Sequence, residues 1–193
     1  MMLELIQLIV LFFVIFDPLA SFAVFYVATK NVKVAEKRII ALYAILIASL
    51  LSFSVLFFGE QLLSLFTTNL NDFRVAGGLI LGILGIKMTL GHPLTNLDNF
   101  KNNTSKGIAA IIGTPLLTGP AAITAIIIAV HDYGRMLTGL AVLIVLVATG
   151  FLLLLSSRFD KLGGKTAIQV ISTMLGLITI AWGVKFIRMG LGI

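Results

Sequence analysis

The sequence predicts an all-α integral membrane protein of six transmembrane helices, arranged as two inverted three-helix repeats, with helices 1 and 4 discontinuous. Three observations lead to this fold class. First, 59% of the 193 residues are hydrophobic and only 11% are charged, whereas soluble domains carry about 25% charged residues. Second, six apolar stretches each approach the roughly 20 residues that cross a bilayer. Third, prolines interrupt the first and the fourth of these stretches.

The six apolar stretches leave only short connections between them. They cover residues 3–28, 39–58, 75–90, 108–130, 136–156 and 167–187. We therefore expect a single transmembrane domain over residues 1–193 with no soluble domain on either side. Glu4 and the absence of Lys or Arg before the first stretch argue against a cleaved leader.

The first stretch holds an Asp-Pro pair near its middle. Asp17 lies about 21 Å of helix beyond Leu3, near the bilayer midplane. Pro18 has no N–H, and a residue before proline is pushed away from helical dihedrals. We expect the helix to break and to restart with Asp17 as N-cap and Pro18 first. The N–H groups of Ala20 and Ser21 would then lack partners in the preceding turn.

The second stretch contains no charged residue, and the third is rich in glycine. Small residues let transmembrane helices approach closely. The glycines of the third and sixth stretches therefore predict a packing stripe. They are Gly78, Gly82, Gly85, Gly176 and Gly183.

The fourth stretch contains "GTPLLTGPAA", residues 113–122, about halfway along its length. A continuous helix is not expected through two prolines and two glycines. Thr114-Pro115 and Gly119-Pro120 each have the form of a cap followed by a first helical residue. The N–H groups of Ala122 and Ile123 would point into the same central region as those of the first break.

The last three stretches repeat features of the first three. "GLILGILGIK" at 78–87 matches "GLITIAWGVK" at 176–185, and Pro18 matches Pro120. The repeats cover about 1–95 and about 107–193. Because each has three helices, the second enters the membrane from the opposite side. Inverted repeats with broken helices are typical of secondary transporters.

Basic residues gather on one predicted face of the membrane. Ten of the 14 lie there: Lys30, Lys33, Lys37, Arg38, Lys87, Lys101, Lys106, Arg158, Lys161 and Lys165. The positive-inside rule makes this face cytoplasmic and puts both termini outside, for a multi-pass protein of the cell membrane. The net charge of +6 is thus a topology signal, and nucleic acid is not an expected partner.

The two breaks predict a site for a small zwitterion. Helix N-termini present N–H donors to a carboxylate, while the Asp17 carboxylate accepts from an ammonium group. The candidate substrate-binding residues are Asp17, Pro18, Ala20, Ser21, Thr114, Pro115, Thr118, Gly119, Pro120, Ala122, Ile123 and Thr124. Two plainer interpretations stay open: Asp17 is only a helix cap, and the small residues only let helices pack.

The chain resembles the MarC family of six-helix prokaryotic membrane proteins, whose archaeal member is described as a small neutral amino acid transporter. The resemblance covers essentially the whole chain. It is carried by Asp17-Pro18 and by "PLLTGPAAI" from Pro115 to Ile123. Ala20, Ala23 and Ala121 stand where the family pattern has Gly, Pro and Gly, which predicts either a tighter pocket or one shaped for another solute. The resemblance implies glycine or alanine as substrate, driven by an ion gradient.

We therefore expect a secondary active transporter of small neutral amino acids, with Asp17 as the candidate residue for coupling to H⁺ or Na⁺. The alternative is a passive channel, or an exporter of other small solutes. An enzyme is not expected, because only one acidic residue lies at membrane depth. No cofactor or metal is predicted beyond the coupling ion.

Overall fold

The computed structural model describes residues 2–30, 32–65, 67–91, 104–156 and 165–193. Every regular element among these residues is a helix. In chain order the elements are α1 (Met2–Phe16), α2 (Pro18–Ala28), α3 (Val34–Leu65), α4 (Leu70–Thr89), α5 (Ser105–Ile111), η2 (Ile112–Leu117), α6 (Pro120–Leu155) and α7 (Lys165–Leu191). The predicted all-α class is confirmed.

Both predicted helix breaks are present. The first separates α1 from α2 at Asp17, and the second separates η2 from α6 at residues 118–119. The prediction that Thr114-Pro115 starts a new helix was wrong, because both residues lie within the π-helical η2. Proline has no N–H to donate, and the helix accommodates the missing hydrogen bond by changing from α-helical to π-helical pairing.

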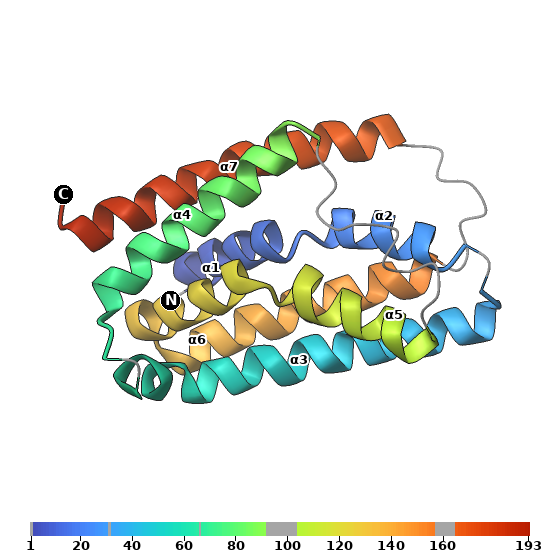
Figure 1. Cartoon of the computed structure of the whole chain (residues 1–193), viewed down its shortest axis with the longest axis horizontal. Coiled ribbons are helices and arrows are strands. Elements are labelled where there is room, and N and C mark those ends of the chain that lie inside the picture. The colour runs from blue at the N-terminus through green and yellow to red at the C-terminus, as the bar shows by residue number, and fades with distance from the viewer. Residues whose placement is uncertain (1, 31, 66, 92–103, 157–164) are drawn as a thin grey trace.

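Helix α6 contains the predicted connection between the fourth and fifth stretches. Gly134 interrupts its 36 residues with a φ of 81°, a backbone conformation that favours glycine. Figure 1 shows the chain turning back at this point, so α6 is a helical hairpin. We call residues 120–133 its first arm and residues 135–155 its second arm.

Four described stretches are long and apolar enough to cross a membrane: Met2–Ala28, Val34–Gln61, Pro120–Leu155 and Val170–Leu191. Helix α4 is not among them because three charged residues, Asp72, Arg74 and Lys87, lie within its 20 residues. These charges stand near the two ends of α4, where long side chains can reach the membrane interface. The chain is thus an integral membrane protein with several apolar helices.

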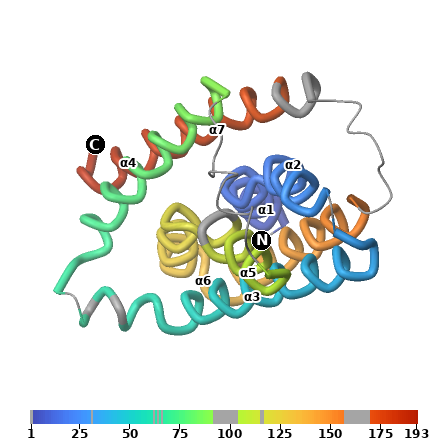
Figure 2. Tube along the Cα trace, turned by 45° about the vertical axis from the view of Figure 1, so that its right-hand side comes forward, coloured from blue at the N-terminus to red at the C-terminus, as the bar shows by residue number. Residues whose placement is uncertain are grey.

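Helices α4 and α7 lie side by side along one edge of the molecule, and α3 lies along the opposite edge (Figures 1 and 2). The first arm of α6 is between them and is buried continuously from Thr124 to Val130. Helix α1 contacts this arm through fully buried side chains that include Phe12 and Phe16. The two helix breaks are therefore held in the centre of the bundle.

Glycines bring α4 and α7 into backbone contact. A methyl group at Gly78 would lie 2.5 Å from the carbonyl oxygen of Gly183, and one at Gly85 would lie 2.6 Å from that of Gly176. The predicted packing stripe is confirmed at these four positions. Gly82 differs, since a methyl group there would have no atom within 4 Å.

Candidate functional site

A cavity of about 110 Å³ lies between the two helix breaks. Three parts of the chain line it: the α1–α2 break, the start of α6 and one face of α4. The lining residues are Ile15, Phe16, Asp17, Ser21, Ile80, Leu84, Gly119, Pro120, Ala121 and Ala122. A water molecule occupies about 30 Å³ in the liquid, so the cavity has room for a solute of a few heavy atoms.

Asp17 is the one ionisable residue among the described residues of this lining. It is buried, with 3% of its surface exposed, and it caps α2 in the left-handed conformation at φ 40° and ψ 69°. Its Oδ1 accepts a hydrogen bond of 3.1 Å from the backbone N–H of Ala20. Its Oδ2 is buried, and no described residue donates a hydrogen bond to it. One carboxylate oxygen thus holds the helix, and the other is available to a ligand.

The start of α2 satisfies its own N–H donors. The Ala20 N–H donates to Asp17 Oδ1, and the Ser21 N–H donates to the Asp17 carbonyl over 2.9 Å. Both groups were predicted to lack partners in the turn before the break, with Asp17 as the N-cap. In the structure Asp17 is the partner of both, through its side chain for Ala20 and through its backbone carbonyl for Ser21. The Ser21 hydroxyl donates to the Phe16 carbonyl over 3.2 Å, which leaves the hydroxyl oxygen as a further acceptor.

The start of α6 has no such cap. Gly119 is its N-cap residue, and this end of the helix has no side-chain cap hydrogen bond among the described residues. The Ile123 N–H donates to the Gly119 carbonyl over 3.1 Å as the first bond of the helix. The Ala121 and Ala122 N–H groups precede that bond and belong to the first turn, whose donors have no intrahelical partner. The uncapped donors are therefore those of Ala121 and Ala122, one position earlier than predicted.

The two breaks give the cavity opposite polar ends. The α1–α2 side presents acceptors, the Asp17 Oδ2 and the Ser21 hydroxyl oxygen. The α6 side presents backbone N–H donors and the positive end of the helix dipole. This arrangement can bind a small solute that carries a positive group at one end and a negative group at the other.

The cavity brings together five of the predicted binding residues: Asp17, Ser21, Gly119, Pro120 and Ala122. Six other predicted residues lie outside the lining: Pro18, Ala20, Thr114, Thr118, Ile123 and Thr124. The side chain of Pro115 is outside the described part of the structure. Binding by any residue of either group stays a prediction.

Three threonines among the predicted residues have other surroundings. The Thr118 hydroxyl donates to the Gly113 carbonyl over 2.9 Å, and the Thr124 hydroxyl donates to the Pro120 carbonyl over 2.9 Å. Both bonds satisfy a buried hydroxyl within its own segment. Thr114 is exposed. These side chains therefore contribute to the second break rather than to the cavity surface.

The sequence analysis did not identify the apolar part of the lining. Ile15 and Phe16 come from the last turn of α1, and Ile80 and Leu84 come from α4. Ile80 and Leu84 are four residues apart, so they share one helix face. No signal in the sequence separates them from the lipid-facing residues of the same helix, because both kinds of position are apolar.

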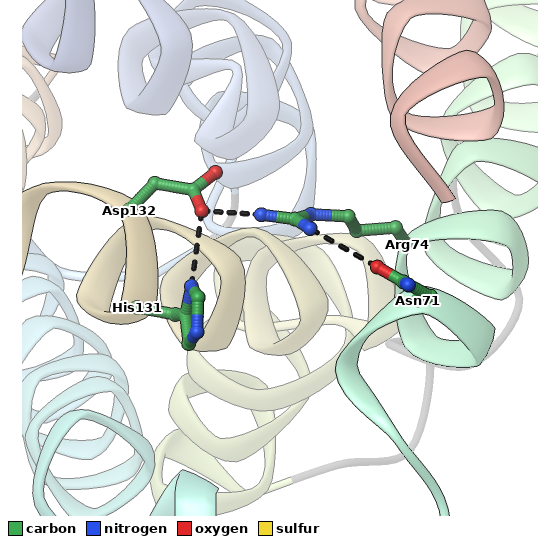
Figure 3. Close-up of polar contacts among 4 residues, drawn as sticks. All are labelled: Asn71, Arg74, His131 and Asp132. Carbon is green, nitrogen blue, oxygen red and sulfur yellow. Dashed lines mark hydrogen bonds and ion pairs between the residues drawn. The ribbon is translucent and has the colours of Figure 1, made fainter. Parts of the chain in front are cut away.

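A polar cluster joins α4 to the hairpin of α6. Figure 3 shows Arg74 reaching both Asn71 on its own helix and Asp132 on α6. The Arg74 side chain is 13% exposed and that of Asp132 is 20% exposed. His131 also contacts Asp132, at 3.2 Å. The sequence analysis assigned no role to these residues.

Known proteins resemble this chain over nearly its full length. A model described as MarC family integral membrane protein matches residues 2–192. The inner membrane protein YhgN of Escherichia coli K12 is 27% identical over 179 residues, covering 92% of this chain and 90% of the relative.

Two other relatives have slightly higher identity. A UPF0056 membrane protein of Methanocaldococcus jannaschii is 30% identical over 189 residues, covering 93% of this chain and 91% of the relative. A UPF0056 membrane protein of Chlamydia pneumoniae is 31% identical over 198 residues, covering 100% and 96%. No solved structure matches the chain. These matches agree with the family resemblance drawn from the two proline motifs.

Proposed function

The chain belongs to the MarC family of integral membrane proteins, and we propose that it is a secondary active transporter of small neutral amino acids of the glycine and alanine class. One observation carries this proposal. Two interrupted helices meet at a shared cavity that has acceptors on one side and uncapped N–H donors on the other. Discontinuous helices that face a central site are typical of transporters.

A zwitterionic amino acid matches both ends of the cavity. Its ammonium group donates to Asp17 Oδ2, which has no hydrogen-bond partner among the residues that the structure describes. Its carboxylate accepts from the Ala121 and Ala122 N–H groups at the start of α6. A buried polar atom without a partner costs about 1–3 kcal/mol, and a charged one costs more. The bound ammonium would remove that cost, which favours a functional role for Asp17 over a purely capping one.

We further propose that the two halves of the chain are inverted repeats. The alignment of 78–87 with 176–185 pairs Gly78 with Gly176 and Gly85 with Gly183. In the structure Gly78 contacts Gly183, and Gly85 contacts Gly176. A two-fold axis that relates the two halves predicts this exchange. If Gly78 of the first half contacts Gly183 of the second, then their equivalents, Gly176 and Gly85, must also contact each other. The charge bias then puts both termini outside.

The driving ion is H⁺ or Na⁺, and Asp17 is the residue proposed to couple it. A proton would bind to the carboxylate directly, whereas Na⁺ would need the carboxylate together with backbone or hydroxyl oxygens. Uptake into proteoliposomes under an imposed proton gradient or an imposed sodium gradient separates these two mechanisms.

The decisive substitution is Asp17→Asn. Asparagine tolerates the left-handed conformation and caps helices well, so the fold should persist while the charge is lost. Removing one partner of a buried charge pair costs about 2–5 kcal/mol, which corresponds to at least about 30-fold weaker substrate binding. Accumulation of labelled glycine or alanine in proteoliposomes should therefore be abolished.

Asp72→Asn is the matched control, because Asp72 is also an acid at a helix start but is exposed and outside the cavity. It should leave uptake unchanged. Normal uptake by Asp17→Asn would make Asp17 a structural cap and would refute the proposed site. Counterflow of labelled substrate should occur with the wild type, since a carrier exchanges substrate and a simple pore does not.

A further inference from the structure

Part of the apolar wall of the cavity comes from α4, a helix that contains neither of the two breaks. Helix α4 contributes Ile80 and Leu84, which lie four residues apart on one face and are half-buried. With Ile15 and Phe16 of α1 they form the non-polar part of the lining. A bound solute that directs its polar groups to Asp17 and to α6 has its remaining atoms against this wall.

The wall is held in place from two sides. Behind it, Gly78 and Gly85 bring the backbone of α4 against that of α7. On its flank, a methyl group at Gly77 would lie 2.1 Å from Cγ2 of Thr124, in the first turns of α6. Helix α4 already touches its neighbours at these glycines. It therefore cannot move closer to them without steric overlap, and it cannot move apart from them without losing these contacts. The depth of the cavity is therefore set by the side chains of Ile80 and Leu84.

We propose that Ile80 and Leu84 are the specificity-determining residues of the cavity and that they limit the size of the substrate's side chain. This inference rests on the proposed function. With the ammonium group at Asp17 and the carboxylate at the α6 N-terminus, the side chain of the amino acid faces the α4 wall. A hydrogen atom or a methyl group fits there, and a branched aliphatic chain meets Ile80 and Leu84.

Shortening the wall should admit larger substrates. One methylene group in an apolar pocket changes discrimination by about 10- to 200-fold. Leu84→Ala removes three carbons, so the uptake ratio of leucine to alanine should rise by at least about tenfold. Ile80→Val removes one carbon and should shift the ratio of valine to alanine in the same direction by a smaller factor.

The matched control is Ile83→Ala, on the same helix. Ile83 adjoins Leu84 in sequence, but its side chain is 59% exposed on the outside of the bundle and is absent from the cavity lining. This variant should leave every uptake ratio unchanged. Labelled glycine, alanine, valine and leucine are measured for all four proteins in proteoliposomes, together with the melting temperature of each purified protein.

The outcomes separate this inference from the proposed function. Uptake of glycine and alanine by the wild type, with unchanged ratios in folded Leu84→Ala and Ile80→Val, would overturn the size-limiting role and leave the transporter intact. Absence of uptake of any amino acid by the wild type would overturn both. If Leu84→Ala does not fold, the milder Ile80→Val decides alone, and an unchanged valine ratio refutes the inference.

Discussion

At the scale of single residues, Asp17 performs two tasks with two oxygens. Oδ1 caps α2 through the Ala20 N–H, and Oδ2 is buried beside the cavity with no hydrogen-bond partner among the described residues. The backbone of Asp17 adopts φ 40°, which costs most L-residues about 1–2 kcal/mol and is tolerated best by Gly, Asn and Asp. A serine would supply the cap, but only an acid supplies both the cap and a charge.

A series of substitutions at position 17 separates the contribution of the helix cap from that of the left-handed backbone to the free energy of unfolding. Asp17→Asn keeps the cap and the tolerance for positive φ, so the free energy of unfolding should change by less than about 1 kcal/mol. Asp17→Val loses a cap of about 1 kcal/mol and adds about 1–2 kcal/mol of backbone strain, so it should lose about 2–3 kcal/mol. Asp17→Gly should lie between them. Reversible unfolding in detergent measures the series, and equal stability of Asn and Val would contradict it.

Prolines made the position of both breaks predictable, because the missing N–H is a local property of the residue. The conformation at the first break was less predictable. A residue before proline usually becomes extended, yet Asp17 is left-handed. This conformation lets the Asp17 N–H complete a 3.1 Å bond to the Phe13 carbonyl at the end of α1. The bond that favours the left-handed conformation over the extended one has its acceptor on Phe13, four residues before Asp17. The Asp-Pro pair alone therefore does not predict it.

At the scale of elements, α4 and α7 pack through glycines at a separation that a side chain would prevent. The contact pairs Gly78 with Gly183 and Gly85 with Gly176. In lipid no hydrophobic force drives helices together, and close packing at small residues supplies the attraction instead. The glycine spacing in the sequence predicted this contact, because seven residues separate the two glycines of each helix.

Two alanine substitutions on α4 test the contact. Gly85→Ala would put a methyl group 2.6 Å from the Gly176 carbonyl oxygen, so it should lower the free energy of unfolding by about 1–3 kcal/mol through overpacking. Gly82→Ala on the same helix meets open space and should be neutral, or stabilising by up to about 1 kcal/mol, since alanine favours helix. Thermal melting of the two purified variants gives the comparison. Equal melting temperatures would show that the glycine contact does not hold the helices.

The role of α4 beside the cavity was not predictable in the same way. Side chains that face lipid and side chains that face an apolar cavity wall have the same chemistry, so hydrophobicity does not distinguish Ile83 from Leu84. In a soluble protein a polar outer face would mark the difference. Only the three-dimensional placement of α4 between α7 and α6 assigns Ile80 and Leu84 to the cavity.

At the scale of the whole molecule, the orientation proposed for the chain in the membrane rests on the basic residues of one predicted face. The chain contains no cysteine, so single introduced cysteines can report each side. Met136, beside the hairpin turn of α6, is 82% exposed, and Lys33 before α3 is also exposed. A membrane-impermeant maleimide should label Met136→Cys in intact cells and should label Lys33→Cys only after the cells are opened. The reverse pattern would invert the predicted topology.

Under the proposed internal symmetry, the ion pair between Arg74 and Asp132 has no counterpart. Offsets of 98 and 102 residues relate Arg74 to Ser172 and Asp132 to Lys30, which cannot form an equivalent pair. In the proposed carrier, a rocking motion that exposes the cavity at the Arg74 end would separate these two opposite charges. The ion pair would then favour the state in which this end is closed, and raised ionic strength should weaken that preference.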